Sequence, residues 1–248
     1  MTDLFFELHR DLPREGPGDD ASTLRALGLL NALPVRPDVL DVGCGPGAQT
    51  LVLARATGGR VTAVDLHQPF LDELGRRAGE AGLTAHIAPL RASMSALPLG
   101  PASFDLVWSE GAIYLMGFDA GLRAWHELLR PGGYLVVSEL TWLADAPPAA
   151  ARAFWAQAYP AMRDRAANRA AVERAGYAAV ADFVLPRSAW FETYYDPLER
   201  RLDALARRYA GDAAALRWLA GERAEIALAR EHGDSFGYVF HCMRKGGS

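Results

Sequence analysis

The sequence contains almost no lysine and almost no cysteine. Of its 26 basic residues only Lys245 is a lysine, which excludes the Tyr-x-x-x-Lys arrangement used by some hydride-transfer enzymes. The two cysteines, Cys44 and Cys242, lie far apart and form no metal-type pair. This scarcity of cysteine, together with an N-terminus that lacks the apolar core of a signal peptide, predicts a reducing, cytoplasmic location.

Strong charge and long apolar runs are also missing. The formal net charge of the 248 residues is −4, which argues against nucleic acid as the main partner. No run reaches the roughly 18 apolar residues of a membrane span, so no membrane partner is predicted. The six histidines show no paired ligand spacing, and no metal is expected. Half the residues are apolar, enough for a buried core, while the oligomeric state stays open.

Apolar runs alternate with helical patterns along the first 140 residues. Near-continuous apolar strands between helices predict an α/β fold with a parallel sheet covered on both faces. Strands are expected at Val39–Val42, Arg60–Asp65, Thr84–Ala88, Phe104–Ser109 and Tyr134–Leu140. Helices are expected at Gly47–Ala56, Pro69–Ala81 and Asp119–Leu129.

We interpret the whole chain, residues 1–248, as a single domain in four parts. Residues 1–38 form an N-terminal helical lid with helices at Thr2–His9 and near Ala21–Ala32, joined by a segment containing EGPGD whose glycines permit closure. Residues 39–140 form the cofactor-binding core. Residues 141–235 supply helical insertions and a strand, Tyr177–Leu185, on the acceptor side, including one or two helices over Asp196–Glu231. Residues 236–248 contain the terminal strand, Phe236–Lys245.

The stretch VLDVGCGPGAQTLVLARA ends a buried strand in three glycines, Gly43, Gly45 and Gly47, before a helix begins. Such a turn brings backbone N–H groups and the positive end of a helix close to a ligand. A tight turn without a ligand needs only one glycine. The motif fits both the dinucleotide pattern G-x-G-x-x-G/A and the pattern G-x-G-x-G, so it predicts a ligand without choosing between a dinucleotide and S-adenosylmethionine.

Two aspartates accompany the glycine turn. Asp65 ends the second strand and suits a ribose diol in either ligand. Asp41 stands two residues before Gly43, where a carboxylate can order the loop and interact through water with an ammonium group, whereas it would repel a pyrophosphate. Asp41 therefore favours S-adenosylmethionine.

Four motifs in order carry a resemblance to a known family. The succession VLDVGCGPG, VTAVDL, MSALPLGPASFDLVWSEGAIY and LLRPGGYLVVSEL resembles the class I S-adenosylmethionine-dependent methyltransferases, in particular the small-molecule group of the ubiquinone/menaquinone-biosynthesis type. The resemblance implies a Rossmann-like three-layer sandwich. Its seven-stranded, mostly parallel sheet has the order 3-2-1-4-5-7-6 with the last strand antiparallel.

The resemblance also implies roles in binding S-adenosylmethionine and its product S-adenosylhomocysteine. The glycines Gly43, Gly45 and Gly47 would meet the amino-acid end, and Asp65 would accept both ribose hydroxyls. Leu66 and Met94 would pack on the two faces of adenine, although Met94 fits a core methionine equally well. Ser93 stands where many relatives have an aspartate, which leaves the contact to the adenine amino group open.

The end of the fourth strand is expected to overhang the reacting centre, because ligands of open parallel sheets bind beyond the carboxyl ends of the strands. Ser109 would border the cofactor there. Glu110 is the best candidate for an acid or base facing the acceptor, with holding the cofactor's ammonium group or the loop as an equal alternative. Tyr114, one turn later, would line the acceptor pocket or pack in the core.

The chemistry predicted is in-line transfer of a methyl group to a small organic acceptor. Several aromatic residues of the insertions would form an aromatic acceptor pocket or, more simply, the core of the insertions: Trp155, Tyr159, Trp190, Tyr194 and Tyr195. Two alternatives stay open: an NAD(P)-dependent oxidoreductase and a non-catalytic cofactor-binding protein.

Overall fold

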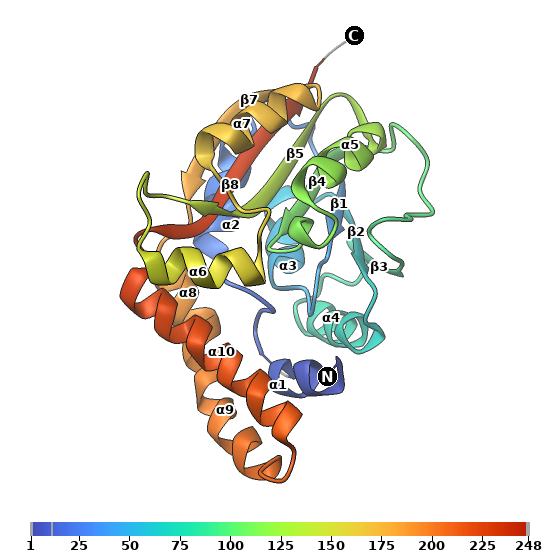
Figure 1. The fold of residues 1–248 in the computed structure, drawn as a ribbon. Coiled ribbons are helices and arrows are strands. Elements are labelled where there is room, and N and C mark those ends of the chain that lie inside the picture. The colour runs from blue at the N-terminus through green and yellow to red at the C-terminus, as the bar shows by residue number, and fades with distance from the viewer. Residues whose placement is uncertain (1, 11, 247–248) are drawn as a thin grey trace.

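The computed structural model describes residues 2–10 and 12–246, and its centre is one sheet (Figure 1). The strand order is β3-β2-β1-β4-β5-β8-β7, and the two-residue strand β6 pairs with β5. The strands are β1 Asp38–Val42, β2 Arg60–Asp65, β3 Ile87–Arg91, β4 Phe104–Glu110, β5 Leu129–Trp142, β6 Arg163–Asp164, β7 Tyr177–Val184 and β8 Phe236–Lys245. β8 runs antiparallel to both its neighbours and the other pairs are parallel, so the predicted order and antiparallel last strand are confirmed once β6 is set aside.

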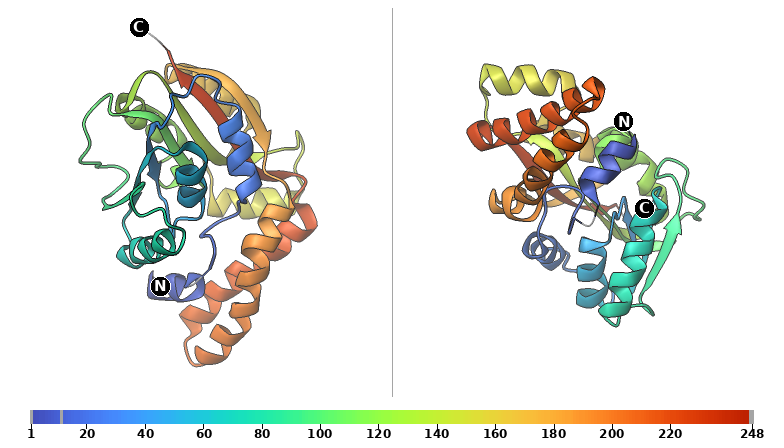
Figure 2. Two further views of the ribbon diagram at one scale, coloured as in Figure 1. Left: turned by 180° about the vertical axis from the view of Figure 1, so that it is seen from behind. Right: turned by 90° about the horizontal axis from the view of Figure 1, so that it is seen from below.

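Helices cover both faces of the sheet. The chain order is α1 Thr2–His9, α2 Asp20–Gly28, α3 Ala48–Thr57, α4 Gln68–Glu80, η1 Ile113–Leu115, α5 Phe118–Leu128, α6 Ala149–Ala158, α7 Arg165–Arg174, α8 Ser188–Trp190, η2 Phe191–Tyr195, α9 Asp196–Arg208 and α10 Ala213–His232. One core cluster joins α2, α3 and α4 to one face, and a second joins α5 and α7 to the other (Figure 2). β1 shows the alternation directly: Val39 belongs to the first cluster and Leu40 to the second.

Four helices lie below the carboxyl ends of the parallel strands. α1, α6, α9 and α10 gather at that edge of the sheet (Figure 1). α9 and α10 form an antiparallel pair, because the turn before Ala213 stops α9 and Asp212 caps α10 by accepting hydrogen bonds from the backbone of residues 214 and 215. The predicted helical stretch Asp196–Glu231 is therefore two helices.

Several predicted boundaries were wrong for local reasons. The third strand begins at Ile87 instead of Thr84, because Gly82 adopts a positive φ of 68° and Leu83 N–H bonds back to Ala78, so the following residues form a turn. The fifth strand already begins at Leu129, which pairs with Phe104 across an irregularity in the register. The second helix ends at Gly28 instead of near Ala32.

Candidate functional site

The three glycines after β1 serve two different structural purposes. All three have positive φ, as a glycine turn requires. A Cβ on Gly43 would lie 2.5 Å from Ala112 Cβ, and one on Gly45 would lie 3.1 Å from Glu15 Cγ. A Cβ on Gly47 would instead overlap the side chain of Leu74 in α4. The first two glycines therefore permit close approach at the ligand-facing side of the loop, and Gly47 permits close packing of the loop against a helix.

Asp65 joins the end of β2 to the glycine loop. One carboxylate oxygen accepts a hydrogen bond from Gly45 N–H at 3.0 Å, and the other accepts from His67 N–H at 2.9 Å. The loop is tied to the same strand by Gly43 N–H and Cys44 N–H, which both donate to Val64 O at 2.9 Å. The aspartate is thus held in place by backbone donors, with its side chain at the wall of a cavity.

Asp41 is fully buried behind the loop. Its carboxylate accepts hydrogen bonds from Thr50 Oγ1 at 2.6 Å and Gln49 Nε2 at 3.3 Å, both in the first turn of α3. Burial raises the pKa of Asp41 to about 7. It orders the loop and the helix start, as the sequence suggested, but it does not line the cavity.

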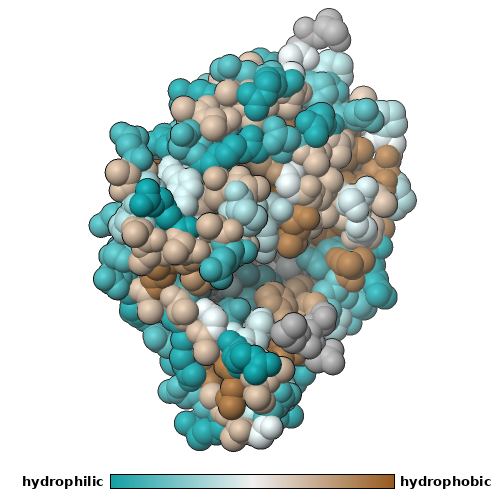
Figure 3. Space-filling model, in the orientation of Figure 1, coloured by the Kyte–Doolittle hydropathy of each residue, from teal (hydrophilic) through white to brown (hydrophobic). Residues whose placement is uncertain are grey.

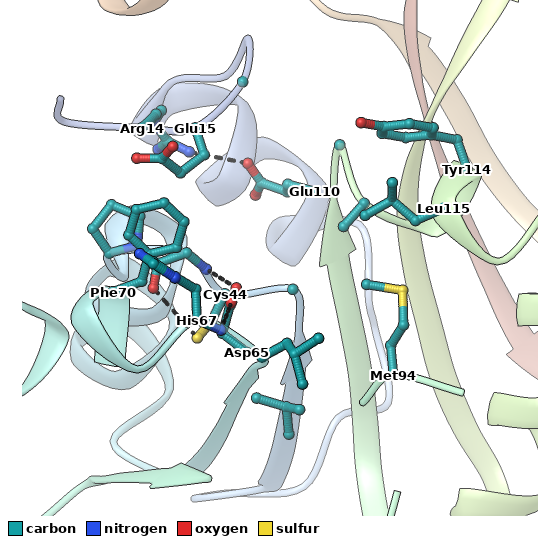
Figure 4. A pocket seen from close by; sticks show the side chains of 18 of the residues that line it. Arg14, Glu15, Cys44, Asp65, His67, Phe70, Met94, Glu110, Tyr114 and Leu115 are labelled. Carbon is teal, nitrogen blue, oxygen red and sulfur yellow. Dashed lines mark hydrogen bonds and ion pairs between the residues drawn. The ribbon is translucent and has the colours of Figure 1, made fainter. Parts of the chain in front are cut away.

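A cavity of about 1020 Å³ opens beyond the carboxyl ends of β1, β2 and β4 (Figures 3 and 4). The predicted site residues among those that line it are Gly43, Gly45, Asp65, Leu66, Ser93, Met94, Glu110 and Tyr114. Asp41, Gly47 and Ser109 lie outside this lining. Ser109 is buried and donates its hydroxyl proton to Val42 O at 2.9 Å, so it ties β4 to β1 and does not face a ligand.

Glu110 is held by three donors. Thr23 Oγ1 donates at 2.7 Å, Trp108 Nε1 at 2.9 Å and Arg14 at 3.1 Å. Burial raises the pKa of Glu110 although Arg14 opposes that shift. With both oxygens engaged, Glu110 is a poor candidate for a base facing an acceptor. Of the alternative roles expected for it, the contacts match the holding of a neighbouring segment.

That segment, residues 12–18, is called the N-terminal strap here. Arg14 binds Glu110 and also Asp20, at 2.9 Å. Arg77 in α4 donates to two strap carbonyls, at residues 12 and 13, both at 3.1 Å. Gly18 N–H donates to Ala189 O at 3.0 Å. These contacts fix the strap over the glycine loop, and sequence reasoning singled out only its glycines, not Arg14.

Glu15 in the strap lines the cavity and was missed by the sequence analysis. Among the missed lining residues, it is the one best suited to bind a charged ligand group. One carboxylate oxygen lies 2.9 Å from His9 Nδ1, while Oε1 is buried without a hydrogen-bond partner among the described residues. Burial raises the pKa of Glu15, and His9 opposes the shift. The only sequence signal was an acidic residue directly before Gly16, which is also typical of a solvated turn.

Aromatic and apolar side chains form the remaining walls. His67 stacks on Phe6 with ring centroids 3.5 Å apart, and both contact Phe70 edge to face. Burial lowers the pKa of His67. Leu66 beside this stack is 64% exposed and lines the cavity, so its apolar side chain can pack on a planar ligand. Figure 4 shows Met94 and Leu115 on the opposite side of the cavity.

Ser93 and Tyr114 have weaker fixed contacts. The Ser93 hydroxyl lies 2.9 Å from the Ser95 hydroxyl, and both are exposed enough to change partners. Tyr114, in η1, is 40% exposed and meets Tyr159 edge to face at 5.9 Å. Tyr114 is therefore a wall of the cavity and not a core residue, one of the two possibilities left open by the sequence.

Other kinds of site find no support in the described part of the chain. No group of three or more His, Cys, Asp or Glu side chains is placed to hold a metal ion among the residues described. Cys44 is buried, and burial raises the pKa of its thiol well above the usual value, which suits a small filler of the loop and not a nucleophile. No helix among the described residues is long and apolar enough to cross a membrane.

Comparison with known proteins finds a methyltransferase-domain match over part of the chain. Residues 39–133 match the model of a methyltransferase domain. Malonyl-[acyl-carrier protein] O-methyltransferase of Pseudescherichia vulneris is 38% identical over 103 residues, 41% of this chain and 38% of that protein. Dimethylglycine N-methyltransferase of Parasynechococcus marenigrum (strain WH8102) is 35% identical over 121 residues, 48% of this chain and 43% of that protein. The alignments thus span less than half the length of these two curated relatives.

Solved structures share the fold over nearly the whole chain. A SAM-dependent methyltransferase from Geobacter sulfurreducens, in complex with S-adenosyl-L-homocysteine, has a TM-score of 0.82 at 20% identity and covers 98% of both chains. The [4+2]-cyclase SpnF has a TM-score of 0.78 at 21% identity, with 100% of this chain and 93% of that chain covered. The domain match and the named relatives support a class I S-adenosylmethionine-dependent methyltransferase, and the solved structures share that fold.

Proposed function

We propose that this protein transfers a methyl group from S-adenosylmethionine to a small organic acceptor in the cytoplasm. One observation carries the proposal: the Asp65 carboxylate, fixed by backbone N–H groups of the loops after β1 and β2, faces a cavity of about 1020 Å³. A cavity of this size suits a cofactor-sized ligand with room beside it. A carboxylate at the end of the second strand suits a ribose diol.

The residues present fit each part of the donor. Asp65 would accept from the ribose hydroxyls, and the exposed Leu66 and the Met94 side chain would cover adenine from two sides. The free backbone N–H groups at the start of α3 suit the donor carboxylate. Glu15, with its unpartnered Oε1, suits the donor ammonium group and would repel a pyrophosphate. This last contact favours a sulfonium donor over the dinucleotide alternative.

When bound, S-adenosylmethionine supplies a methyl group attached to a positively charged sulfur. The chain itself has to orient the acceptor and exclude water, which accounts for much of the rate in such a displacement. Tyr114 and Leu115, both at the side of the cavity away from Asp65 (Figure 4), would hold the acceptor. The strap would act as the lid, since Arg14 anchors it to Glu110 above the glycine loop.

Calorimetric titration with S-adenosylhomocysteine tests the proposal, with NAD⁺ as the competing ligand. We expect S-adenosylhomocysteine to bind and NAD⁺ to show no heat. Binding of NAD⁺ alone would favour an oxidoreductase. Binding of S-adenosylhomocysteine without methyl transfer to any member of a panel of small alcohols, acids, thiols and amines would favour a non-catalytic binding protein or another reaction, because a fold does not fix an activity.

A further inference from the structure

Next to Tyr114 the structure contains an acidic tyrosine cluster that the donor does not need. Its members come from η1, β5, the end of α6, α10 and β8 and are Tyr114, Glu139, Tyr159 directly after α6, Glu222, Glu225 and Tyr238. Tyr114 lines the cavity, and Tyr159 meets it edge to face at 5.9 Å. A Cβ on Gly111, another cavity residue, would lie 3.8 Å from Tyr238 Oη. The cluster therefore adjoins the cavity at the side where an acceptor would bind.

The members are close enough to influence one another electrically. Tyr114 interacts with all three carboxylates, and Tyr238 interacts with Tyr114, Tyr159, Glu139 and Glu225. Four of the six side chains, Tyr159, Glu222, Glu225 and Tyr238, are partly exposed. Of the six, Tyr114 lines the cavity, and the others lie behind it.

Glu139 leaves one buried acceptor unused. It lies at the carboxyl end of β5 and is 2% exposed. Tyr159 Oη donates to its Oε1 at 2.5 Å, while Oε2 has no hydrogen-bond partner among the described residues. A buried carboxylate oxygen without a donor is unfavourable and needs a partner to offset the cost. Burial raises the pKa of Glu139 to about 7, so the position lacks a sufficient positive charge.

The cations nearest to the cluster are already occupied. Arg163 attracts Glu139 but forms its ion pair with Asp119. His9 attracts Glu225 but is hydrogen-bonded to Glu15. Glu222 forms no hydrogen bond or ion pair with any described residue, and burial and Glu225 raise its pKa to about 7. The cluster thus combines three carboxyl groups with tyrosine rings, and an ionised carboxylate and an aromatic face both attract an ammonium group.

Resting on the proposed methyl transfer, we infer that the acceptor is a small amine, held as its ammonium form between the carboxylates of Glu139 and Glu222 and the rings of Tyr114 and Tyr159. Before transfer, one ammonium proton passes to a carboxylate of the cluster. The freed nitrogen lone pair then forms the bond to the donor methyl carbon while the methyl–sulfur bond breaks, with its electron pair leaving on sulfur. A neutral or acidic acceptor would leave the carboxylates unpaired.

Choline and its uncharged carbon isostere 3,3-dimethylbutan-1-ol have the same shape, so a comparison of their affinities measures the contribution of the positive charge to binding. Both are titrated at pH 8, above the pKa of about 7 to which burial raises Glu139 and Glu222, into the free protein and into protein saturated with S-adenosylhomocysteine. We expect choline to bind at least about tenfold more tightly than the isostere, a difference of about 1.4 kcal/mol. Equal binding of the two probes, or no binding of choline at millimolar concentration to either form, would overturn the inference.

Isosteric variants test whether the carboxylates of Glu139 and Glu222 bind the positive charge of choline. The double variant Glu139→Gln/Glu222→Gln should lower choline affinity at least about tenfold and leave the affinity for S-adenosylhomocysteine unchanged. Glu231→Gln, on the exposed surface of α10, is the matched control and should change neither. Unchanged choline affinity in the double variant would refute the site. Failure of S-adenosylhomocysteine to bind would refute the donor proposal instead, and the choline titration of the free protein would still decide the cation site.

Discussion

The donor wall (Gly43, Gly45 and Asp65) lines the cavity, and the acidic tyrosine cluster adjoins the same cavity through Tyr114, but the two are built differently. The donor wall is fixed by backbone N–H groups that donate to Asp65 and to Val64 O. The cluster is assembled from side chains of four elements and of the residue that follows α6, with Tyr159–Glu139 as its one internal hydrogen bond among the described residues. A backbone-built wall tolerates few substitutions but presents one fixed shape. A wall made of side chains can change its specificity one residue at a time.

The largest effect is expected where Gly47 of the loop behind the donor wall packs on α4. Gly47→Val should lower the free energy of unfolding by about 4 kcal/mol or more, because left-handed strain and overlap with Leu74 add together. Gly75→Val is the matched control on the exposed side of α4, where a Cβ meets nothing within 4 Å, and should change stability by less than about 1 kcal/mol. Chemical denaturation measures both. Equal effects would show that the loop does not depend on Gly47.

The second prediction concerns the ion pair that anchors the strap, between Arg14 and Glu110. Arg14→Met leaves Glu110 buried without its cation and should lower the free energy of unfolding by about 3 kcal/mol, since Thr23 and Trp108 still donate to the carboxylate. The double variant Arg14→Met/Glu110→Gln should recover part of this loss. Arg10→Met, at an exposed position, is the control. If the double variant is as unstable as Arg14→Met, the ion pair does not anchor the strap.

Buried carboxylates in both regions make stability depend on pH in the same direction. The pKa of Asp41 is raised from 3.8 to about 7, so its stabilising contribution is complete below about pH 4 and is lost as the pH rises through 7. Asp41→Asn should make this decline shallower by about 1 kcal/mol per pH unit. Denaturation at several pH values measures the slope, and Asp72→Asn, which is exposed, should leave it unchanged. A slope unaffected by Asp41→Asn would show that Asp41 keeps its ordinary pKa.

Ser93 is expected to have the smallest effect. Because its hydroxyl shares a weakly constrained contact with Ser95, Ser93→Ala should weaken S-adenosylhomocysteine binding by less than about 0.7 kcal/mol, roughly threefold. Calorimetry alongside Ser95→Ala gives the comparison. A loss of more than tenfold, or about 1.4 kcal/mol, would show that the Ser93 hydroxyl does hold the adenine amino group.

The donor wall and the acidic tyrosine cluster also differ in how far the sequence could predict them. The sheet order followed from the family resemblance. The glycine turn and Asp65 could be singled out because they stand at the carboxyl ends of two consecutive strands, β1 and β2, which meet at one edge of the sheet, while their contact with a donor stays a prediction. The sequence did not reveal that Gly47 faces Leu74 or that Asp41 and Ser109 point away from the cavity, because these directions depend on packing with α4, α3 and β1. The pairing of Arg14 with Glu110 joins residues 96 positions apart, and no periodicity encodes it. Acidic residues such as Glu222 and Glu225 are typical of an exposed helical face, so nothing in the sequence indicates that they belong to a cluster beside the cavity.

Asp65 tests the central claim most directly. Asp65→Ala removes the carboxylate proposed to accept from the ribose and should weaken S-adenosylhomocysteine binding by roughly 1–3 kcal/mol in calorimetry. Asp72→Ala, the same substitution on the exposed face of α4, should leave the affinity unchanged, and both variants should still unfold in one cooperative transition above the temperature of the titration. An Asp65→Ala protein that binds S-adenosylhomocysteine as tightly as the wild type would contradict the account.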